Sequence, residues 1–223
     1  MIKAIIFDFD GLLIDSEPAW FEARKSLLTE FNMDWTLDDQ KQNLGVSTKH
    51  WVNYLSNKLA NRLTSDEILN KVIFNMIEMY KNGEVLSKPG ADVALKYCKD
   101  NNFILGLASG SYKELLFTGL KSKMWEDYFD EIISSDDLKN GKPAPDIYIE
   151  ILKRLNVKPE ESVVVEDSKD GITAGAAAKS NVIAVPSKEY PVPANVLSSA
   201  KRVLESLFEL PETVREMTSA RGG

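Results

Sequence analysis

Short runs of apolar residues recur along the chain and indicate buried β-strands. The first run, Ala4-Ile5-Ile6, belongs to a strand predicted over residues 3–9, which ends near Gly11. Further strands are predicted in the second half of the chain, over residues 103–108, 131–133, 162–165 and 182–185. Helical segments separate these strands, as in βαβ units with right-handed crossovers. The pattern predicts an α/β fold with a doubly wound, Rossmann-like parallel sheet of about five strands.

A different pattern fills the stretch between the first strand and Gly83. Apolar residues recur there with the period of an amphipathic helix, and Thr64-Ser65-Asp66-Glu67 has capping-box spacing before the last helix. The periodic positions are Trp20, Ala23, Leu27, Leu28, Phe31, Trp51, Leu55, Leu59, Ile68, Val72, Met76 and Tyr80. Stripes of this kind more often form a helical core than a ligand site. We therefore predict two domains: an α/β domain of residues 1–14 and 87–223, and an all-helical domain of residues 15–86 inserted after the first strand.

Composition and charge exclude several classes of protein. The net charge of -7 argues against nucleic acid or an anionic membrane as the main partner, because both need a basic surface. Cys98 is the single cysteine and His50 the single histidine, so an internal disulfide and a histidine-based zinc site are excluded. No apolar run approaches the ~20 residues that span a bilayer. Because Asp8 follows the first apolar run, we expect no export signal and a cytoplasmic protein.

Two carboxylates follow the first apolar run, Asp8 and Asp10. In an extended chain this spacing places both side chains on one face, roughly 7 Å apart along the strand. Two like charges beside a hydrophobic strand are costly unless a cation or a shared proton relieves them. Asp and Gly are also common turn residues, so the pair alone leaves an ordinary strand end open.

The residues that follow the other strands add chemistry, because ligands bind outside the carboxyl ends of strands in open α/β sheets. Ser109 and Gly110 follow one strand and open a helix, which describes either a phosphate site or an ordinary helix cap. Lys142 lies in a proline-stiffened loop, although a lone lysine is usually a solvated surface residue. Glu166 and Asp167 follow the Val163-Val164-Val165 strand.

Together these residues predict a phosphoryl-transfer site. Four carboxylates that converge on one small volume cannot all be ionised without a cation: they are Asp8, Asp10, Glu166 and Asp167. Oxygen ligands without His or Cys indicate Mg²⁺. Lys142 would add a positive charge, and Ser109 with backbone amides would face an anion.

These residues resemble the four motifs of the haloacid dehalogenase superfamily, in order and with the expected spacing. The motifs are Asp8-Phe9-Asp10-Gly11-Leu12-Leu13-Ile14-Asp15-Ser16-Glu17-Pro18, Leu107-Ala108-Ser109-Gly110-Ser111, Gly141-Lys142-Pro143-Ala144-Pro145-Asp146 and Glu166-Asp167-Ser168 with Gly171-Ile172. The resemblance covers residues 2–186. The helical insertion is similar to the α-helical cap domain of the β-phosphoglucomutase and sugar-phosphate phosphatase branch, which would make the α/β domain the catalytic core.

The resemblance implies a role for each site residue. Asp8 would be the nucleophile that forms an aspartyl phosphate, and Asp10 the general acid and then the general base. Ser109 and Lys142 would hold the phosphoryl oxygens, with help from the backbone amides of Phe9 and Gly110. The implied cofactor is Mg²⁺, held by the Asp8 carboxylate, the Asp10 carbonyl and Asp167, with Glu166 bound to the ion or next to its ligands.

Departures from the mutases of this branch favour hydrolysis. Trp20 stands where they carry a cap histidine, and Gly45-Val46-Ser47-Thr48 replaces their Gly-Val-Ser-Arg loop. The run Gly-Leu-Leu-Ile-Asp-Ser-Glu-Pro is more similar to hexose-phosphate phosphatases of the 2-deoxyglucose-6-phosphate type, and Asp10 argues against a dehalogenase. The expected activity is that of a phosphoric monoester hydrolase acting on small phosphorylated metabolites, foremost sugar phosphates.

Two alternatives stay open. One is a sugar phosphomutase of the β-phosphoglucomutase type. The other is a non-enzymatic phospho-receiver, although such modules usually run about 120 residues without a helical insertion. We expect a monomer whose cap closes over the sheet edge and selects the substrate. The expected specificity positions are Trp20, residues 45–49, His50 and Tyr112.

Overall fold

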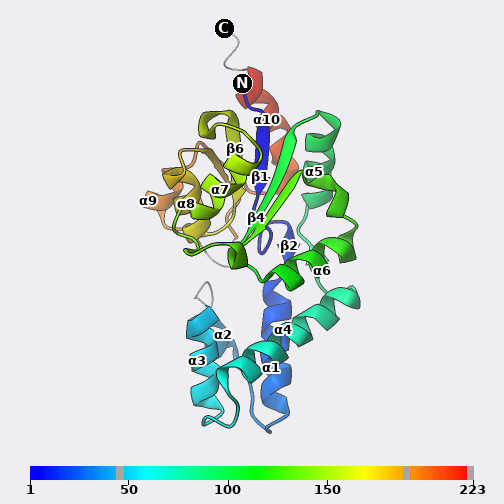
Figure 1. Cartoon of the computed structure of the whole chain (residues 1–223), viewed down its shortest axis with the longest axis vertical. Coiled ribbons are helices and arrows are strands. Elements are labelled where there is room, and N and C mark those ends of the chain that lie inside the picture. Colours follow the sequence, from blue (N-terminus) through cyan, green and yellow to red (C-terminus); the bar gives the residue numbers. More distant parts are fainter. Residues whose placement is uncertain (44–47, 188–190, 220–223) are drawn as a thin grey trace. The chain divides into compact units, whose positions relative to one another are not determined.

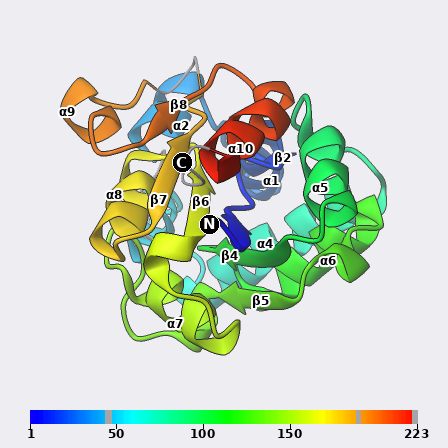
Figure 2. The same cartoon turned by 90° about the horizontal axis from the view of Figure 1, so that it is seen from above.

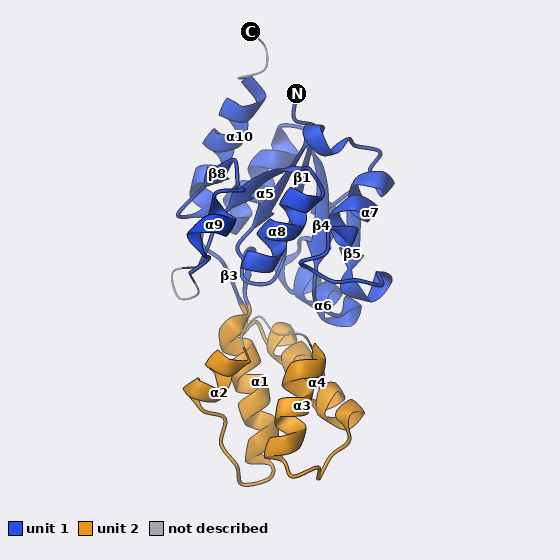
Figure 3. Cartoon of the chain, turned by 90° about the vertical axis from the view of Figure 1, so that its left-hand side faces the viewer, with its two compact units in different colours: residues 1–15, 86–223 blue, residues 16–85 orange. Residues whose placement is uncertain are grey.

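The computed structural model describes residues 1–43, 48–187 and 191–219 (Figure 1). The chain divides into two compact units, which Figure 3 colours separately. Unit 1 consists of Met1–Asp15 and Leu86–Gly223, and unit 2 of Ser16–Val85. No helix within the described residues is both long and apolar enough to cross a membrane.

Unit 1 contains a parallel sheet, six-stranded within the described residues, in the order β5-β4-β1-β6-β7-β8. Its strands are β1 (Ala4–Phe7), β4 (Ile104–Ser109), β5 (Glu131–Ser134), β6 (Ser162–Glu166), β7 (Asn181–Ala184) and β8 (Arg202–Val203). The doubly wound α/β fold expected from the sequence is confirmed. The strand of this sheet that sequence reasoning missed is β8, because its two residues are exposed and carry no apolar run.

Helices cover both faces of this sheet (Figure 2). Helices α7 (Asp146–Arg154) and α8 (Lys169–Ala177) pack on one face, and α5 (Ala91–Asp100) and α10 (Leu210–Ser219) lie on the other. The remaining α-helices of unit 1 are α6 (Lys113–Lys123) and α9 (Ala194–Leu197). Its short 3-10 helices are η1 (Glu126–Tyr128), η2 (Ser135–Asp137), η3 (Pro159–Glu161) and η4 (Leu207–Glu209). Every residue of β1 is buried, which explains its uninterrupted apolar sequence.

The first strand is shorter than the predicted span of residues 3–9, since β1 ends at Phe7. After it the chain turns through Gly11, whose φ is +84°. Both Leu13 and Ile14 donate their amide hydrogens to the carbonyl of Phe9. Asp8 and Asp10 therefore follow the strand rather than lie on it, and the extended-chain spacing does not apply to them.

The chain leaves unit 1 and returns to it through two short paired strands. These are β2 (Ile14–Asp15) and β3 (Leu86–Ser87), which form an antiparallel two-stranded sheet. The Lys88 ammonium lies 3.1 Å from the Asp15 carboxylate, and the Lys88 amide donates to the carbonyl of Leu13.

Unit 2 is helical throughout its regular elements. Its described helices are α1 (Glu17–Thr29), α2 (Leu37–Gln42), α3 (Thr48–Lys58) and α4 (Ser65–Lys81). The predicted capping box is present, since the Thr64 side chain accepts from the Glu67 amide and the Glu67 side chain accepts from the Thr64 amide. Most of the periodic apolar positions are buried, including Leu27 and Val72, so the helical periodicity identified this core correctly.

Asp39 connects two helices of unit 2. Its carboxylate accepts hydrogen bonds from the Thr36 amide and hydroxyl, from the Tyr54 hydroxyl at 2.6 Å and from Lys58 at 2.6 Å. The buried position of Asp39 would raise its pKa, but these donors outweigh that effect and hold the pKa well below its usual range. The carboxylate thus joins the start of α2 to α3.

We expect Asp39→Asn to lower the free energy of unfolding by about 2 kcal/mol, because hydrogen bonds to a charged group are worth ~1.5–3 kcal/mol. Since the folded pKa of Asp39 is lowered, this stabilisation is present above about pH 4 and is lost as the pH falls towards the folded pKa. Urea denaturation should show a smaller difference between variant and wild type at pH 3 than at pH 7. The exposed neighbour Asp38 supplies the control, and Asp38→Asn should change stability by less than ~0.5 kcal/mol. Equal effects of both substitutions would contradict the assignment.

Candidate active site

The residues singled out by the sequence gather at the carboxyl edge of the sheet. Asp8 follows β1, Ser109 ends β4 and Glu166 ends β6. Lys142 lies between β5 and α7, in the loop before Asp146. Parallel pairing in register brings these strand ends to one edge, because Phe7 lies opposite both Leu107 of β4 and Val165 of β6.

Lys142 places a largely buried ammonium group at this edge, with its side chain 11% exposed. Its Nζ donates to Asp8 Oδ1, to Glu166 Oε1 at 2.6 Å and to the carbonyl of Ala108 at 3.0 Å. Nζ also lies 5.1 Å from the ring centroid of Tyr148. Burial would lower the pKa of Lys142, but the charges of Asp8 and Glu166 outweigh this and raise the pKa well above its ordinary value. Lys142 is therefore a charged ammonium group held by three acceptors.

Glu166 is fully buried and its carboxylate is fully engaged. Oε1 accepts from Lys142 and, at 2.6 Å, from the Tyr148 hydroxyl. Oε2 accepts from the Asp167 amide and from the amide and hydroxyl of Ser168. Five donors to two oxygens leave Glu166 little capacity for a further partner, so its charge orients the loop that follows β6.

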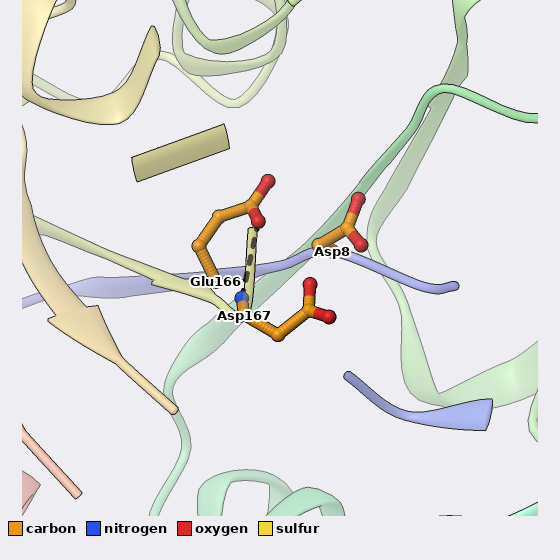
Figure 4. A group of neighbouring side chains, drawn as sticks. All are labelled: Asp8, Glu166 and Asp167. Carbon is orange, nitrogen blue, oxygen red and sulfur yellow. Dashed lines mark hydrogen bonds between the residues drawn. The ribbon is translucent and has the colours of Figure 1, made fainter. Parts of the chain in front are cut away.

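Asp8, Glu166 and Asp167 bring three carboxylates together (Figure 4). One oxygen from each lies within 4.8 Å of the other two. Burial, then the charge of Glu166, raise the pKa of Asp8 to about 7, although Lys142 opposes the shift. The pKa of Asp167 is raised well above its usual value by burial, Glu166 and Asp8. The site therefore holds more negative charge than Lys142 alone can balance.

This donor set fits a hard divalent cation. Oδ1 of Asp167 is buried and has no hydrogen-bond partner among the described residues. An unsatisfied buried carboxylate oxygen beside a second carboxylate is costly, and a cation at this point would remove the cost. Gly11 makes room here, because a Cβ at its position would stand 2.3 Å from Asp167 Oδ2. Oxygen-only ligands of this kind suit Mg²⁺.

Asp10 lies near enough to Asp8 for its charge to raise the pKa of Asp8 further, but it is not in the group of three carboxylates. Its Oδ2 accepts from the hydroxyl of Ser111 at 2.6 Å and from that of Ser109 at 3.3 Å. The structure thus groups three of the four predicted carboxylates, and the side chain of Asp10 faces the two serines after β4. The strand ends at Phe7, so the extended backbone assumed for the pair is not present.

The other predicted site residues surround these groups. Phe9 is buried between the two aspartates, and Gly110 is exposed, with nothing within 4 Å of the position that a Cβ would take. Ser109 is fully buried, and its hydroxyl also accepts from the Ser111 amide at 3.0 Å. The position of a Cβ at Gly110 is therefore open to solvent.

The expected specificity positions are only partly described. Residues 45–47 lie outside the described part of the chain. Trp20 is half-buried in unit 2, with its ring 6.1 Å from that of Trp51 and 5.1 Å from the guanidinium of Arg24. His50 is exposed on α3, and Tyr112 is half-buried just before α6.

Sequence reasoning assigned no role to three residues that contact the site. Tyr148 binds Glu166, Ser111 binds Asp10, and Ser168 binds Glu166 while its hydroxyl accepts from the Gly171 amide at the start of α8. Ser111 and Ser168 stand inside the quoted motifs, so their positions were visible. In the sequence, Tyr148 does not differ from an ordinary apolar position of a helix. Only the structure shows that its hydroxyl binds Glu166.

Comparisons with known proteins agree with this geometry. The family model described as haloacid dehalogenase-like hydrolase matches residues 5–185. The phosphorylated carbohydrates phosphatase of Thermotoga maritima is 34% identical over 178 residues, 79% of this chain and 82% of that protein. Hexitol phosphatase B of Escherichia coli (strain K12) is 34% identical over 212 residues, 94% of each chain. A crystal structure of a candidate β-phosphoglucomutase from Thermotoga maritima superposes with a TM-score of 0.83 at 29% identity, covering 96% of this chain and 99% of that one.

The substitution Gly171→Ala should force the Glu166 carboxylate out of its position. A Cβ at Gly171 would stand 1.8 Å from Glu166 Oε1, and the five hydrogen bonds of Glu166 leave its carboxylate no place to move. We expect a loss of about 2–3 kcal/mol in the free energy of unfolding, measured by urea denaturation. Gly141→Ala is the matched control, because open space surrounds that position, and it should stay within ~0.5 kcal/mol of wild type. If the Gly171→Ala variant were as stable as the wild type, the tight packing of Gly171 against Glu166 would be contradicted.

Proposed function

Because this chain belongs to the haloacid dehalogenase-like hydrolase family, we propose that it is a Mg²⁺-dependent phosphatase acting through Asp8 on small phosphorylated metabolites, foremost sugar phosphates. The family membership expected from the four motifs is thereby confirmed. The chain is a phosphoric monoester hydrolase, in keeping with two 34% identical relatives named for phosphorylated carbohydrates and for hexitol phosphate.

One observation carries the assignment of Asp8 as the nucleophile. Its carboxylate receives a hydrogen bond from the buried Lys142 ammonium and stands in the cluster with Asp167. An attacking carboxylate must be ionised, and burial beside Glu166 opposes this by raising the pKa of Asp8 to about 7. Lys142 and a bound cation are the two positive charges that would keep Asp8 ionised.

The proposed reaction has two balanced steps. An Asp8 oxygen bonds to phosphorus while the bond from phosphorus to the leaving oxygen breaks, and Asp10 gives that oxygen a proton. Water then attacks the aspartyl phosphate, Asp10 takes a proton from the water, and Asp8 is released with inorganic phosphate. Ser109, Lys142 and the amides of Phe9 and Gly110 would hold the phosphoryl oxygens.

The proposed ligands of Mg²⁺ are the Asp8 carboxylate, the Asp10 carbonyl and Asp167. The unpartnered Asp167 Oδ1 supports this choice, and the five donors to Glu166 argue that Glu166 acts by holding Lys142 and the Asp167 loop. When bound, the ion would neutralise charge on the phosphoryl group and on these carboxylates. We also propose that the chain is a cytoplasmic monomer and that unit 2 selects the substrate.

A sugar phosphomutase is the second candidate, because the Thermotoga maritima structure is named for β-phosphoglucomutase. A mutase must hold a second phosphate, usually with arginine, and Thr48 stands at the corresponding loop position. The candidates differ in their products. Phosphorus NMR with glucose 1-phosphate isomers distinguishes net phosphate release from isomerisation without it.

Wild-type protein with Mg²⁺ should release inorganic phosphate from members of a sugar-phosphate panel, and Asp8→Asn should reduce the rate at least ~10³-fold, because the nucleophile is lost. Phosphate release is measured colorimetrically, and circular dichroism checks folding. Asp100→Asn, which alters an exposed carboxylate on α5, should retain wild-type activity. Unchanged release by Asp8→Asn would overturn the nucleophile assignment, and isomerisation without release would favour the mutase.

Addition of Mg²⁺ should raise the thermal unfolding temperature of metal-free protein, because the ion binds the folded state and relieves repulsion between Asp8 and Asp167. Asp167→Asn should abolish this rise, and Asp100→Asn should preserve it. Chelation should stop phosphate release, with recovery on adding Mg²⁺. An equal rise in wild type and Asp167→Asn would exclude Asp167 as a ligand.

A further inference from the structure

The loop after β4 presents two serine hydroxyls to one oxygen of Asp10. Ser111 Oγ donates to Asp10 Oδ2 at 2.6 Å, and Ser109 Oγ lies 3.3 Å from the same oxygen. Strong hydrogen bonds from a hydroxyl to a carboxylate have lengths of about 2.5–2.7 Å. The bond from Ser111 falls in this range, and that from Ser109 is long.

The two hydroxyls also differ in their other partners. Ser109 Oγ accepts from the Ser111 amide at 3.0 Å and belongs to a fully buried residue at the end of β4. Ser111 is half-buried, and its hydroxyl donates to Asp10. Ser109 therefore stands at the strand end, where a phosphoryl group would bind, whereas Ser111 reaches across to Asp10.

The backbone of Ser111 is held in place from the neighbouring strand. Ser134, the last residue of β5, donates its hydroxyl to the Ser111 carbonyl at 2.6 Å. Ser135 donates its hydroxyl to the Gly110 carbonyl at 2.7 Å, and the Lys113 amide donates to Asp136 at 2.9 Å. The hydroxyl of Ser111 thus projects from a loop with few alternative positions.

We propose that Ser111 is the positioning residue for Asp10, holding its carboxyl group where it exchanges a proton with the leaving oxygen, whereas Ser109 serves the phosphoryl oxygens. The inference rests on the proposed phosphatase function. The hydroxyl binds Oδ2 and so limits the rotation of the carboxyl group, which gives up a proton to the leaving oxygen. That proton passes to the leaving oxygen as its bond to phosphorus breaks and the bond from Asp8 to phosphorus forms.

The dependence of the rate on the leaving group tests this role. A sugar alkoxide needs a proton to leave, whereas p-nitrophenolate leaves readily without one. General acids contribute about 10²–10⁴-fold, so Ser111→Ala should lower kcat/KM for a sugar phosphate at least ~10-fold. For p-nitrophenyl phosphate the loss should stay below ~3-fold, because kcat/KM reports steps through leaving-group departure.

Three comparisons separate positioning from a structural role. Ser111→Thr, which keeps the hydroxyl, should restore most of the sugar-phosphate rate. Ser135→Ala removes a hydroxyl bond from the same loop and should change the ratio of the two kcat/KM values little. Ser109→Ala should lower kcat/KM for both substrates by similar factors, because a contact to the phosphoryl group serves both.

A double variant completes the test, because residues that act through one another are non-additive. With Asp10→Asn in place, Ser111→Ala should cause little further loss with the sugar phosphate. Equal losses on both substrates, or no loss on either, would overturn the role of Ser111 and leave the phosphatase intact. A wild-type protein that releases no phosphate from either substrate would overturn the proposed function, and the inference with it.

Discussion

The buried ammonium group of Lys142, shared between Asp8 and Glu166, is the interaction on which the sheet edge depends. Removing a charged lysine and two carboxylates from water is costly, and their mutual attraction offsets that cost only with good geometry and further hydrogen bonds. The Ala108 carbonyl, the Tyr148 hydroxyl and the amides after β6 supply those bonds. Hydrogen bonds therefore hold Lys142 and both carboxylates in one continuous network.

The single positive charge of Lys142 does not balance the negative charge of the carboxylates around it. Asp167 contributes a third carboxylate, with Oδ1 buried and unpartnered among the described residues, so the edge favours a cation from solvent. Gly11 and Gly171 permit the crowding, because a side chain at either position would collide with Asp167 or Glu166. The two glycines thus shape the site as directly as its charged residues do.

The topology of the sheet places different groups of site residues at different strand ends. The ends of β1 and β6 carry the nucleophile candidate and the carboxylates around it, while the end of β4 carries the serines that contact Asp10. Strand β5 contributes Ser134, which holds the Ser111 backbone. In the proposed two-step hydrolysis, proton transfer and phosphoryl binding would then be served by separate residues within one edge.

The sequence by itself determined the doubly wound sheet, the helical core of unit 2 and the residues at each strand end, because apolar runs and helical periodicity report burial directly. It also carried the family, through Asp8, Ser109, Lys142 and Asp167 in their motifs. Only the tertiary structure decided that Asp10 faces Ser109 and Ser111, that Tyr148 binds Glu166 and that β8 joins the sheet. Turn geometry and contacts between distant segments decide these features, and neither leaves a periodic signal in the chain.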